Sequence, residues 1–326
     1  MFRFIFTSFF TMILLLTCVT LSYPEEVRGV SDKTIKIGLM GGLTGPAADV
    51  WIPISNGVKA LFNIVNENGG IHGRKIKYIL EDDRYSIPLA ISSFKKLFFR
   101  DKIFALQGAS GLGHSAAIIP LAKRNKIPIL TPNSEKRFFY PAMKHVFCII
   151  PWYQDHAKGV MEYIYNDLKI KRPKIALMYP DMGSGKDSRD TMRKLVKVYP
   201  VDGYKEIVIA FGGVDFTTEA LTLRKWKPDV VYIHGYISDT ASILKSARRL
   251  KFSTKFIASQ YSCVPKTVAL AGEAAKELIG INCYGIWEGK EAGVKELRKA
   301  SKLLDPKVKK RDTNFFQGWF AATLFR

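Results

Sequence analysis

Cysteine is scarce in this chain, with four residues among 326. Cys18 lies in an apolar N-terminal stretch, which leaves Cys148, Cys263 and Cys283 for the rest of the chain. An odd number of cysteines gives no disulfide framework. A bond between Cys263 and Cys283 stays open as an alternative in an oxidising compartment. We expect buried free thiols instead, because unpaired cysteine behaves as a small apolar residue.

Motifs for catalysis and cofactor binding are also missing. The five histidines are scattered without metal-ligand spacing. Segment 183–188 (GSGKDS) lacks the first glycine of a phosphate-binding loop, and the glycines of segment 38–45 do not have the dinucleotide-binding spacing. Ser110 is not at a nucleophile elbow, because Leu112 stands where that motif needs glycine. We therefore predict a protein that is not an enzyme, with no catalytic residues, no metal and no cofactor.

Carboxylates are few beside the basic residues. The chain has 50 Lys and Arg against 29 Asp and Glu, a formal net charge of +21. The basic residues are spread along the sequence rather than gathered into one stripe, so nucleic acid is not a predicted partner. We expect a generally basic surface, with attraction to anionic membranes or ligands as the alternative. The acidic run 81–83 is interpreted as a solvated strand end.

The N-terminal residues 1–22 have the pattern of a signal peptide. Arg3 is the only charge, an apolar run follows around 13–16, and small residues surround position 20. A retained membrane anchor is the alternative, but the apolar run is short for a full span. Thr17 before Cys18 departs from the lipoprotein cleavage pattern, so lipid attachment at Cys18 is not favoured.

The segment 35–83 has the complete sequence pattern of a β-α-β unit, including the turn and the helix end. Alternating apolar residues at 35–39 predict a strand, and a glycine turn over 41–46 follows it. Apolar residues three or four apart between Val58 and Val65 predict a helix that ends at Gly69-Gly70, before a second strand at 75–80. Such a unit implies a right-handed crossover and a parallel strand pair. Ligands of parallel sheets bind beyond the carboxyl ends of the strands, so segment 41–51 is a candidate ligand loop.

The alternation of strands and helices continues to the end of the chain. Further strands are predicted at 103–106, 127–130, 146–150, 174–179, 206–210, 229–233 and 255–258. We therefore predict an α/β protein of two doubly wound parallel-sheet lobes, joined near 146–151 and again near 281–286. Lobe 1 is expected over 31–148, with 285–326 returning to it, and lobe 2 over 149–284.

The chain resembles the periplasmic solute-binding proteins of branched-chain amino-acid-type ABC transporters, over roughly residues 33–326. The residues that carry the resemblance are 35–38 (IKIG), 43–47 (LTGPA), 56–57 (NG), 66–75 (NENGGIHGRK), 81–83 (EDD), 120–122 (PLA), 127–128 (IP), Pro132, 174–177 (KIAL), 215–216 (DF), 227–229 (KPD) and 235–236 (GY).

The resemblance implies a type I periplasmic binding fold, in which a multi-strand hinge closes two lobes over a ligand. It also implies a periplasmic, leucine-binding-protein-like monomer that delivers a small solute to an ABC permease in the inner membrane. Members of the family usually continue for a few tens of residues beyond the helix predicted at 313–325. Because this chain stops at Arg326, which is expected to lie within that helix, a C-terminal truncation is expected.

Carried over residue by residue, the family's ligand contacts fall on strand ends in both lobes. In lobe 1 they are Trp51, Gly111, Leu112, Asn133, Ser134 and Glu135, and in lobe 2 they are Met182, Tyr236 and Gln260. Each also has a plain structural interpretation: Trp51, Met182 and Tyr236 as packing, Glu135 as the partner of a surface cation, and Asn133 and Ser134 as turn residues.

Four of these positions depart from the amino-acid-binding pattern. Leu112 replaces the usual Ser or Thr, Glu135 a Thr, Met182 a frequent Tyr, and Gln260 the acidic residue that meets the ammonium group. The carboxylate of Glu135 would repel that of an amino acid. These departures predict an amide, aromatic or cationic solute in place of free leucine.

Two other functions stay open at this point. The same clamp serves extracytoplasmic sensors that regulate a signalling partner. A secreted amidase-like enzyme would need a nucleophile and a base, for which Ser110 and His114 are the only loose candidates.

Overall fold

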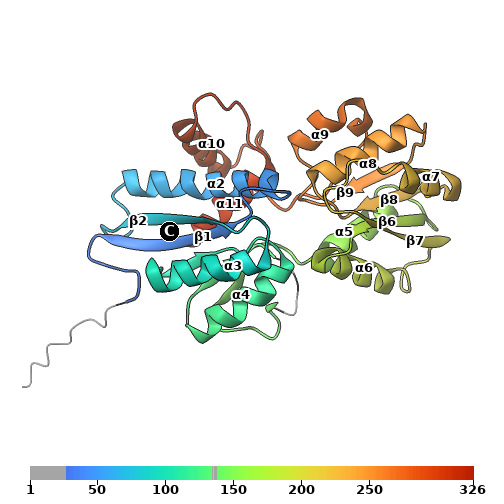
Figure 1. The fold of residues 1–326 in the computed structure, drawn as a ribbon. Helices are drawn as coiled ribbons and strands as arrows, with labels where there is room; N and C mark the ends of the chain where they lie inside the picture. The colour runs from blue at the N-terminus through green and yellow to red at the C-terminus, as the bar shows by residue number, and fades with distance from the viewer. Residues whose placement is uncertain (1–26, 134, 136–137) are drawn as a thin grey trace, which may run out of the picture.

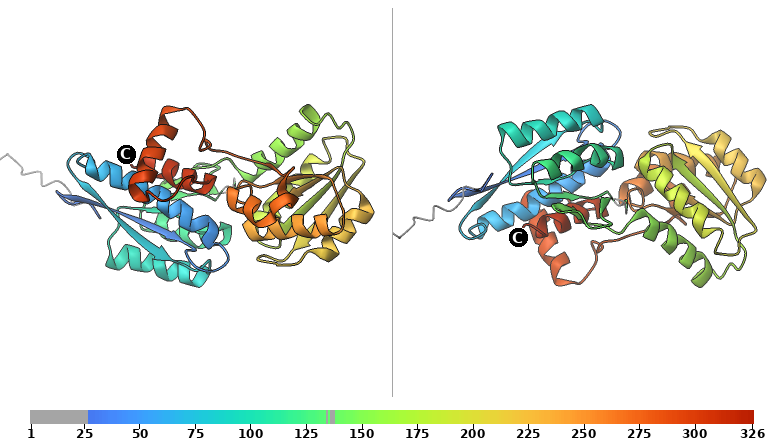
Figure 2. Two further views of the ribbon diagram at one scale, coloured as in Figure 1. Left: turned by 90° about the horizontal axis from the view of Figure 1, so that it is seen from above. Right: turned by 90° about the horizontal axis from the view of Figure 1, so that it is seen from below.

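A computed structural model describes residues 27–133, 135 and 138–326, and it has two parallel α/β lobes side by side (Figures 1 and 2). The predicted signal peptide and Ser134 lie outside the described residues. Within the described part, no helix is both long and apolar enough to cross a membrane.

The first lobe is built on a five-stranded sheet in the order β2-β1-β3-β4-β5, with every pair parallel. Its strands are β1 (Thr34–Gly41), β2 (Lys75–Asp82), β3 (Ala105–Gln107), β4 (Ile129–Thr131) and β5 (Val146–Cys148). Its helices are α2 (Ala48–Glu67), α3 (Ile87–Lys95), the π-helical turn η1 (Lys96–Arg100), α4 (Leu112–Arg124), α10 (Ala292–Leu304) and α11 (Thr313–Thr323). Figure 1 shows α2 on one face of the sheet and α3 and α4 on the other.

The second lobe repeats this plan in the strand order β10-β9-β8-β6-β7, again with every pair parallel. Its strands are β6 (Lys174–Pro180), β7 (Gly203–Ile209), β8 (Val230–Ile233), β9 (Lys255–Ala258) and β10 (Ile279–Gly280). Its helices are α5 (Tyr153–Asn166), α6 (Gly183–Leu195), α7 (Thr217–Trp226), α8 (Ile237–Arg249), α9 (Pro265–Ala271) and the 3₁₀ turn η3 (Gly272–Ala275).

The predicted fold class, two doubly wound parallel-sheet lobes, is confirmed. Two details differ. The short β10 has too few residues to show a period and was not predicted. The last helix ends at Thr323, so Arg326 lies beyond it rather than within it.

The core of lobe 1 depends on close packing between α2 and α11. Buried residues of α2 recur three or four apart, including Val58, Leu61 and Val65, and they pack with Phe315 and Trp319 of α11. The C-terminal helix α11 therefore covers this face of the sheet together with α2.

Two glycines set the distance between these helices. A Cβ added to Gly318 would lie 1.9 Å from the Ile54 carbonyl oxygen, and one added to Gly57 would lie 2.1 Å from the Phe315 carbonyl oxygen. Neither neighbour can move without shifting a helix, because both are backbone atoms.

We expect Gly318→Ala to lower the free energy of unfolding by about 1–3 kcal/mol, because the added methyl group forces α11 away from α2. Urea denaturation measures this loss. Gly159→Ala is the matched control: this glycine lies within α5, with open space where a Cβ would stand. There alanine should stabilise the protein by about 0.5–1 kcal/mol. Equal effects at both positions would contradict the packing argument.

Candidate functional site

The carboxyl ends of both sheets face one another and define the candidate site. Tyr85, after β2, and Tyr236, after β8, share a hydrogen bond of 2.8 Å between their hydroxyls. The Tyr261 hydroxyl, after β9, donates to the Pro132 carbonyl oxygen at 2.9 Å. The two lobes are thus in direct contact, as in a closed clamp.

Apolar and ionic contacts reinforce this closure. Val50, Trp51 and Ile54 of α2 form one buried cluster with Ile237 and Val264 of lobe 2. Lys266 of α9 also forms an ion pair with Asp49 at the start of α2. Because both side chains of that pair are largely exposed, it adds little stability beside the buried cluster.

Aromatic rings line the site continuously from one lobe to the other. The ring of Tyr85 lies 4.8 Å from His114 and 5.5 Å from Phe211, and Tyr236 stacks with Tyr261 at 6.4 Å between centroids. Burial raises the pKa of Tyr85, Tyr236 and Tyr261 above the usual tyrosine value. Their hydroxyls therefore stay protonated, and each can donate one hydrogen bond.

The floor of lobe 1 contains a buried carboxylate. Asp83 is fully buried and accepts a short hydrogen bond from the Ser110 hydroxyl and another from the Tyr85 amide. Burial raises the pKa of Asp83, and these hydrogen bonds oppose the rise. The interpretation of 81–83 as a solvated strand end is wrong for Asp83, because the chain turns inward after β2 and buries it.

The predicted lobe 1 residues have different surroundings. Trp51 is buried and donates from Nε1 to the Ser110 carbonyl oxygen at 3.1 Å. The Asn133 amide nitrogen donates to Ala109 O, Ser115 Oγ and Thr131 Oγ1, so its donors serve lobe 1 itself. Glu135 is half-buried.

Gly111 and Leu112 lie at the N-terminus of α4, where Gly111 adjoins Tyr85 of the same lobe and Leu112 approaches lobe 2. A Cβ on Gly111 would stand 2.7 Å from the Tyr85 hydroxyl. Leu112 packs across the cleft, since a Cβ on Gly183 of lobe 2 would lie 2.9 Å from its Cδ2 atom. The first backbone N–H groups of α4 have no partner within the helix, so this turn offers donors beside an apolar contact.

The predicted lobe 2 residues lie after three strands of the second sheet. Half-buried Met182 is the N-cap residue of α6, and Tyr236 is the N-cap residue of α8. Gln260 is buried, and its side-chain amide makes no hydrogen bond of good geometry, although it lies near the Tyr261 hydroxyl. A buried amide without partners is costly, and a bound solute would supply them.

Three residues of the site were missed from the sequence, Tyr85, Phe211 and Tyr261, and His114 was considered only as a base for Ser110. Tyr85, Phe211 and Tyr261 each follow a strand within a few positions, and this position was the available signal. Ser110 and His114 do not form the nucleophile–base pair considered above, because the Ser110 hydroxyl donates to Asp83. Among the described residues, no group of three or more His, Cys, Asp or Glu could hold a metal ion.

A separate cavity of about 840 Å³ lies behind the cleft, at the hinge. Both connections between the lobes and α11 line it, and it contains none of the predicted site residues. Cys148 and Cys283 border it as free, partly buried thiols, and Cys263 is likewise free.

The family model for periplasmic binding proteins matches residues 34–325. The chain belongs to the periplasmic binding protein family.

Relatives of this periplasmic binding protein have low sequence identity but are similar over most of the chain. The Leu/Ile/Val-binding protein of Citrobacter freundii is 24% identical over 277 residues, covering 82% of this chain and 71% of that protein. The Leu/Ile/Val-binding protein of Escherichia coli K12 is 23% identical over 279 residues, with the same coverage.

Solved structures agree on the fold. A branched-chain amino acid ABC transporter protein from Thermus thermophilus with bound valine has a TM-score of 0.83 at 21% identity, covering 90% of this chain and 77% of that one. A solute-binding protein from R. palustris in complex with benzoate has a TM-score of 0.77 at 20% identity, covering 89% and 79%.

Below the cleft, this periplasmic binding protein buries two histidines. Tyr153 packs edge-on against His156 and His234, and the His156 Nε2 atom lies 3.3 Å from the Cys283 sulfur in the hinge. Burial lowers the pKa of His156 to about 4, although the nearby Asp155 carboxylate acts in the opposite direction. Burial likewise lowers the pKa of His234 to about 3.

Stability should therefore fall in mild acid. Unfolded histidine binds a proton near pH 6.5, whereas folded His156 stays neutral until about pH 4, so protons favour the unfolded chain between these values. His156 alone then removes up to about 3 kcal/mol as the pH falls through this window.

We expect His156→Gln to lose less stability than the unaltered protein between pH 7 and pH 5, as measured by urea denaturation at each pH. His72→Asn, at an exposed turn, is the control and should change this difference less. An unchanged pH dependence in His156→Gln would show that His156 does not remain neutral in the fold.

Proposed function

We propose that this protein is an extracytoplasmic receptor that holds a small solute between its two lobes and delivers it to an ABC permease. Family membership supports the binding role. The described relatives bind amino acids or serve ABC transporters, and these roles support the delivery step.

We further propose that the solute is a small amide-bearing or aromatic molecule rather than free leucine. The observation that carries this proposal is the unsatisfied, buried amide of Gln260 beside the ring of Tyr261. An amide can donate and accept, so it pairs with another amide or with a ring substituent more completely than with an ammonium group.

The rest of the site supports the same class of solute. The rings of Tyr85, Tyr236 and Phe211 offer flat, apolar surfaces, and the two tyrosines add protonated hydroxyls at their edges. Leu112 supplies an apolar contact where an amino-acid binder would supply a hydroxyl. One solved structure of similar fold is in complex with benzoate, and this supports an aromatic solute.

Solute exchange requires the lobes to separate. The hydrogen bond between Tyr85 and Tyr236 spans the cleft, and Leu112 packs on Gly183. A solute that reaches Gln260 must displace these contacts or enter while they are open, and closure then buries it among the rings.

A thermal-shift screen over amino acids, amides, aromatic acids and polyamines, followed by calorimetry, tests the proposed class. We expect amide or aromatic compounds to raise the melting temperature and leucine and valine to leave it unchanged. Gln260→Leu should weaken binding of the best compound at least tenfold, because it removes both polar atoms. Gln154→Leu on α5 is the matched control and should bind normally. Tight binding of leucine or valine would overturn the proposed class.

A further inference from the structure

Lysines that are dispersed in the sequence come together at the outer edges of the fold. Because the carboxyl ends of the strands face the cleft, the segments before each strand lie at the opposite edge of the sheet. Before β6, β7, β8 and β9 of lobe 2 these segments are 166–174, 193–203, 223–230 and 247–255. We call them together the lobe 2 tip. The segment before β10, with Glu273, Lys276 and Glu277, is not basic and is not included.

The four segments form one continuous surface. They precede β6, β7, β8 and β9, which are neighbours in the order β9-β8-β6-β7. The Tyr165 hydroxyl donates to Pro200 O at 2.6 Å, and Arg224 donates to Leu250 O at 3.0 Å. The Thr254 hydroxyl donates to Pro228 O at 2.8 Å.

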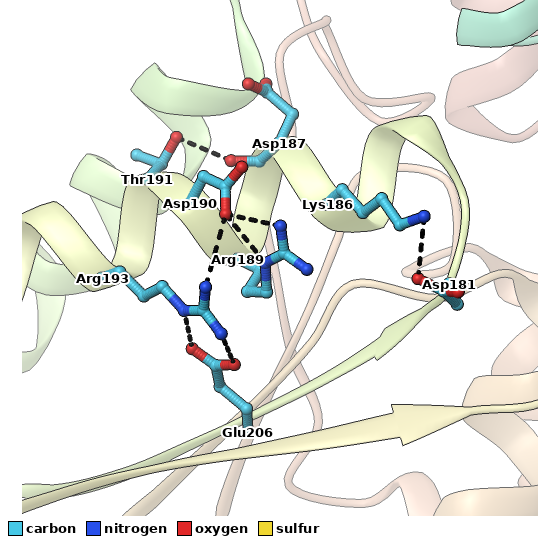
Figure 3. A network of polar contacts seen from close by, with 8 residues as sticks. All are labelled: Asp181, Lys186, Asp187, Arg189, Asp190, Thr191, Arg193 and Glu206. Carbon is cyan, nitrogen blue, oxygen red and sulfur yellow. Dashed lines mark hydrogen bonds and ion pairs between the residues drawn. The ribbon is translucent and has the colours of Figure 1, made fainter.

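The lobe 2 tip is strongly basic. It contains fourteen Lys and Arg residues against three acidic ones, Asp167, Asp202 and Asp229. Some of the tip cations have acidic partners: Arg172 pairs with Asp202, Arg193 with Glu206 and Arg249 with Asp215. Figure 3 shows the Arg193 pair beside those of Lys186 with Asp181 and Arg189 with Asp190. Most of the fourteen basic residues still have no ion-pair partner within the tip itself, all of which the structure describes. Excess positive charge therefore concentrates at the tip.

Three tip lysines occupy a backbone conformation that disfavours them. Lys169, Lys227 and Lys251 have φ values of 57°, 55° and 51°, in the left-handed region where helices usually end with glycine. A side chain there costs about 1–2 kcal/mol. Favourable contact of a cation with a helix C-terminus contributes only about 0.3–1 kcal/mol at an exposed position, which does not offset that cost.

The tip also carries apolar and aromatic groups among its charges. Val198 is 79% exposed, between Lys197 and Tyr199. The rings of Tyr165 and Tyr199 lie 5.1 Å apart beside it. Tyrosine and exposed aliphatic side chains within a basic surface are typical of proteins that contact the interface of a bilayer.

A cavity of about 320 Å³ lies at the edge of the tip. Its lining includes Arg248 and Lys251 as well as Glu273 and Glu277, and Glu277 is paired with Lys255. The Arg248 guanidinium and the Lys251 ammonium would attract a phosphate, and the two glutamates oppose it.

We propose that the lobe 2 tip binds the surface of an anionic phospholipid bilayer. Lipid phosphates lie against the tip lysines and arginines, and Val198 and Tyr199 enter the headgroup layer. The corresponding edge of lobe 1 is also basic. It adjoins Val27, the first described residue, so the proposal is limited to lobe 2. Bilayer binding would hold the receptor near membrane proteins, independently of which solute it binds.

Co-sedimentation with phospholipid vesicles tests this proposal. We expect binding to vesicles that contain phosphatidylglycerol at low salt, loss of binding at high salt, and none to pure phosphatidylcholine. The triple variant Lys169→Gly, Lys227→Gly, Lys251→Gly should bind about a hundredfold more weakly, since each basic residue contributes about fivefold near such a surface. Glycine is favoured at all three positions, so this variant should fold at least as stably.

Two further variants distinguish bilayer binding at the tip from general charge attraction and from binding of a soluble polyanion. Lys295→Gln, Lys299→Gln, Lys302→Gln removes the same charge from the exposed face of α10 and should bind vesicles nearly as the unaltered protein does. Val198→Ser should weaken vesicle binding without changing retention on heparin, because only a bilayer offers an apolar layer.

Three results would overturn the proposal. The first is equal vesicle binding by the triple-glycine variant and the unaltered protein, and the second is an equal loss in the α10 variant. The third is retention on heparin without any vesicle binding, which would indicate a soluble polyanion as the partner.

Discussion

Every strand of both sheets runs parallel to its neighbours, and the remaining features of this protein depend on that constraint. Parallel strands place all turns that follow them at one edge and all turns that precede them at the other. In both lobes the following turns meet across the cleft and carry Tyr85, Tyr236 and Tyr261. The preceding turns lie at the outer edges, where Lys169, Lys227 and Lys251 are found. The parallel topology therefore places the candidate binding residues and the excess basic residues at opposite edges of the sheet.

The cleft edge satisfies most of its own polar groups. Asp83 accepts from Ser110 and from the Tyr85 amide, and the two N–H groups of the Asn133 side chain are shared among three acceptors within lobe 1. These bonds keep the wall rigid, because a buried polar group without a partner is costly. The amide of Gln260 remains without partners against that background. The Gln107 side-chain amide and the His114 Nε2 atom also lack partners at this edge, so a solute in the cleft would meet unsatisfied polar groups in lobe 1 as well as Gln260 in lobe 2.

The fold could be predicted from the sequence because its signals are local. Apolar alternation at 35–39 and the glycines at 69–70 depend only on neighbouring residues, and the structure has β1 and the end of α2 there. The partners of Tyr85 could not be predicted in this way. Tyr236 lies 151 positions away, and nothing in local spacing links the two lobes. The burial of Asp83 was misjudged for the same reason, since it depends on a turn packed beneath Ser110.

The placement of the basic residues is a second feature that local sequence does not predict. A net charge of +21 spread along the sequence predicts only a basic surface. Folding gathers basic residues at one edge of the sheet, because helix C-termini and the turns after them favour cations and all lie at that edge. The dipole explains why lysines and arginines end α6, α7 and α8. It does not explain why lysine rather than glycine occupies the strained position after α7 and α8. Lys102 and Lys126 of lobe 1 adopt the same conformation, so the strained lysines support an anionic partner at the lobe 2 tip only together with its net charge and its exposed Val198.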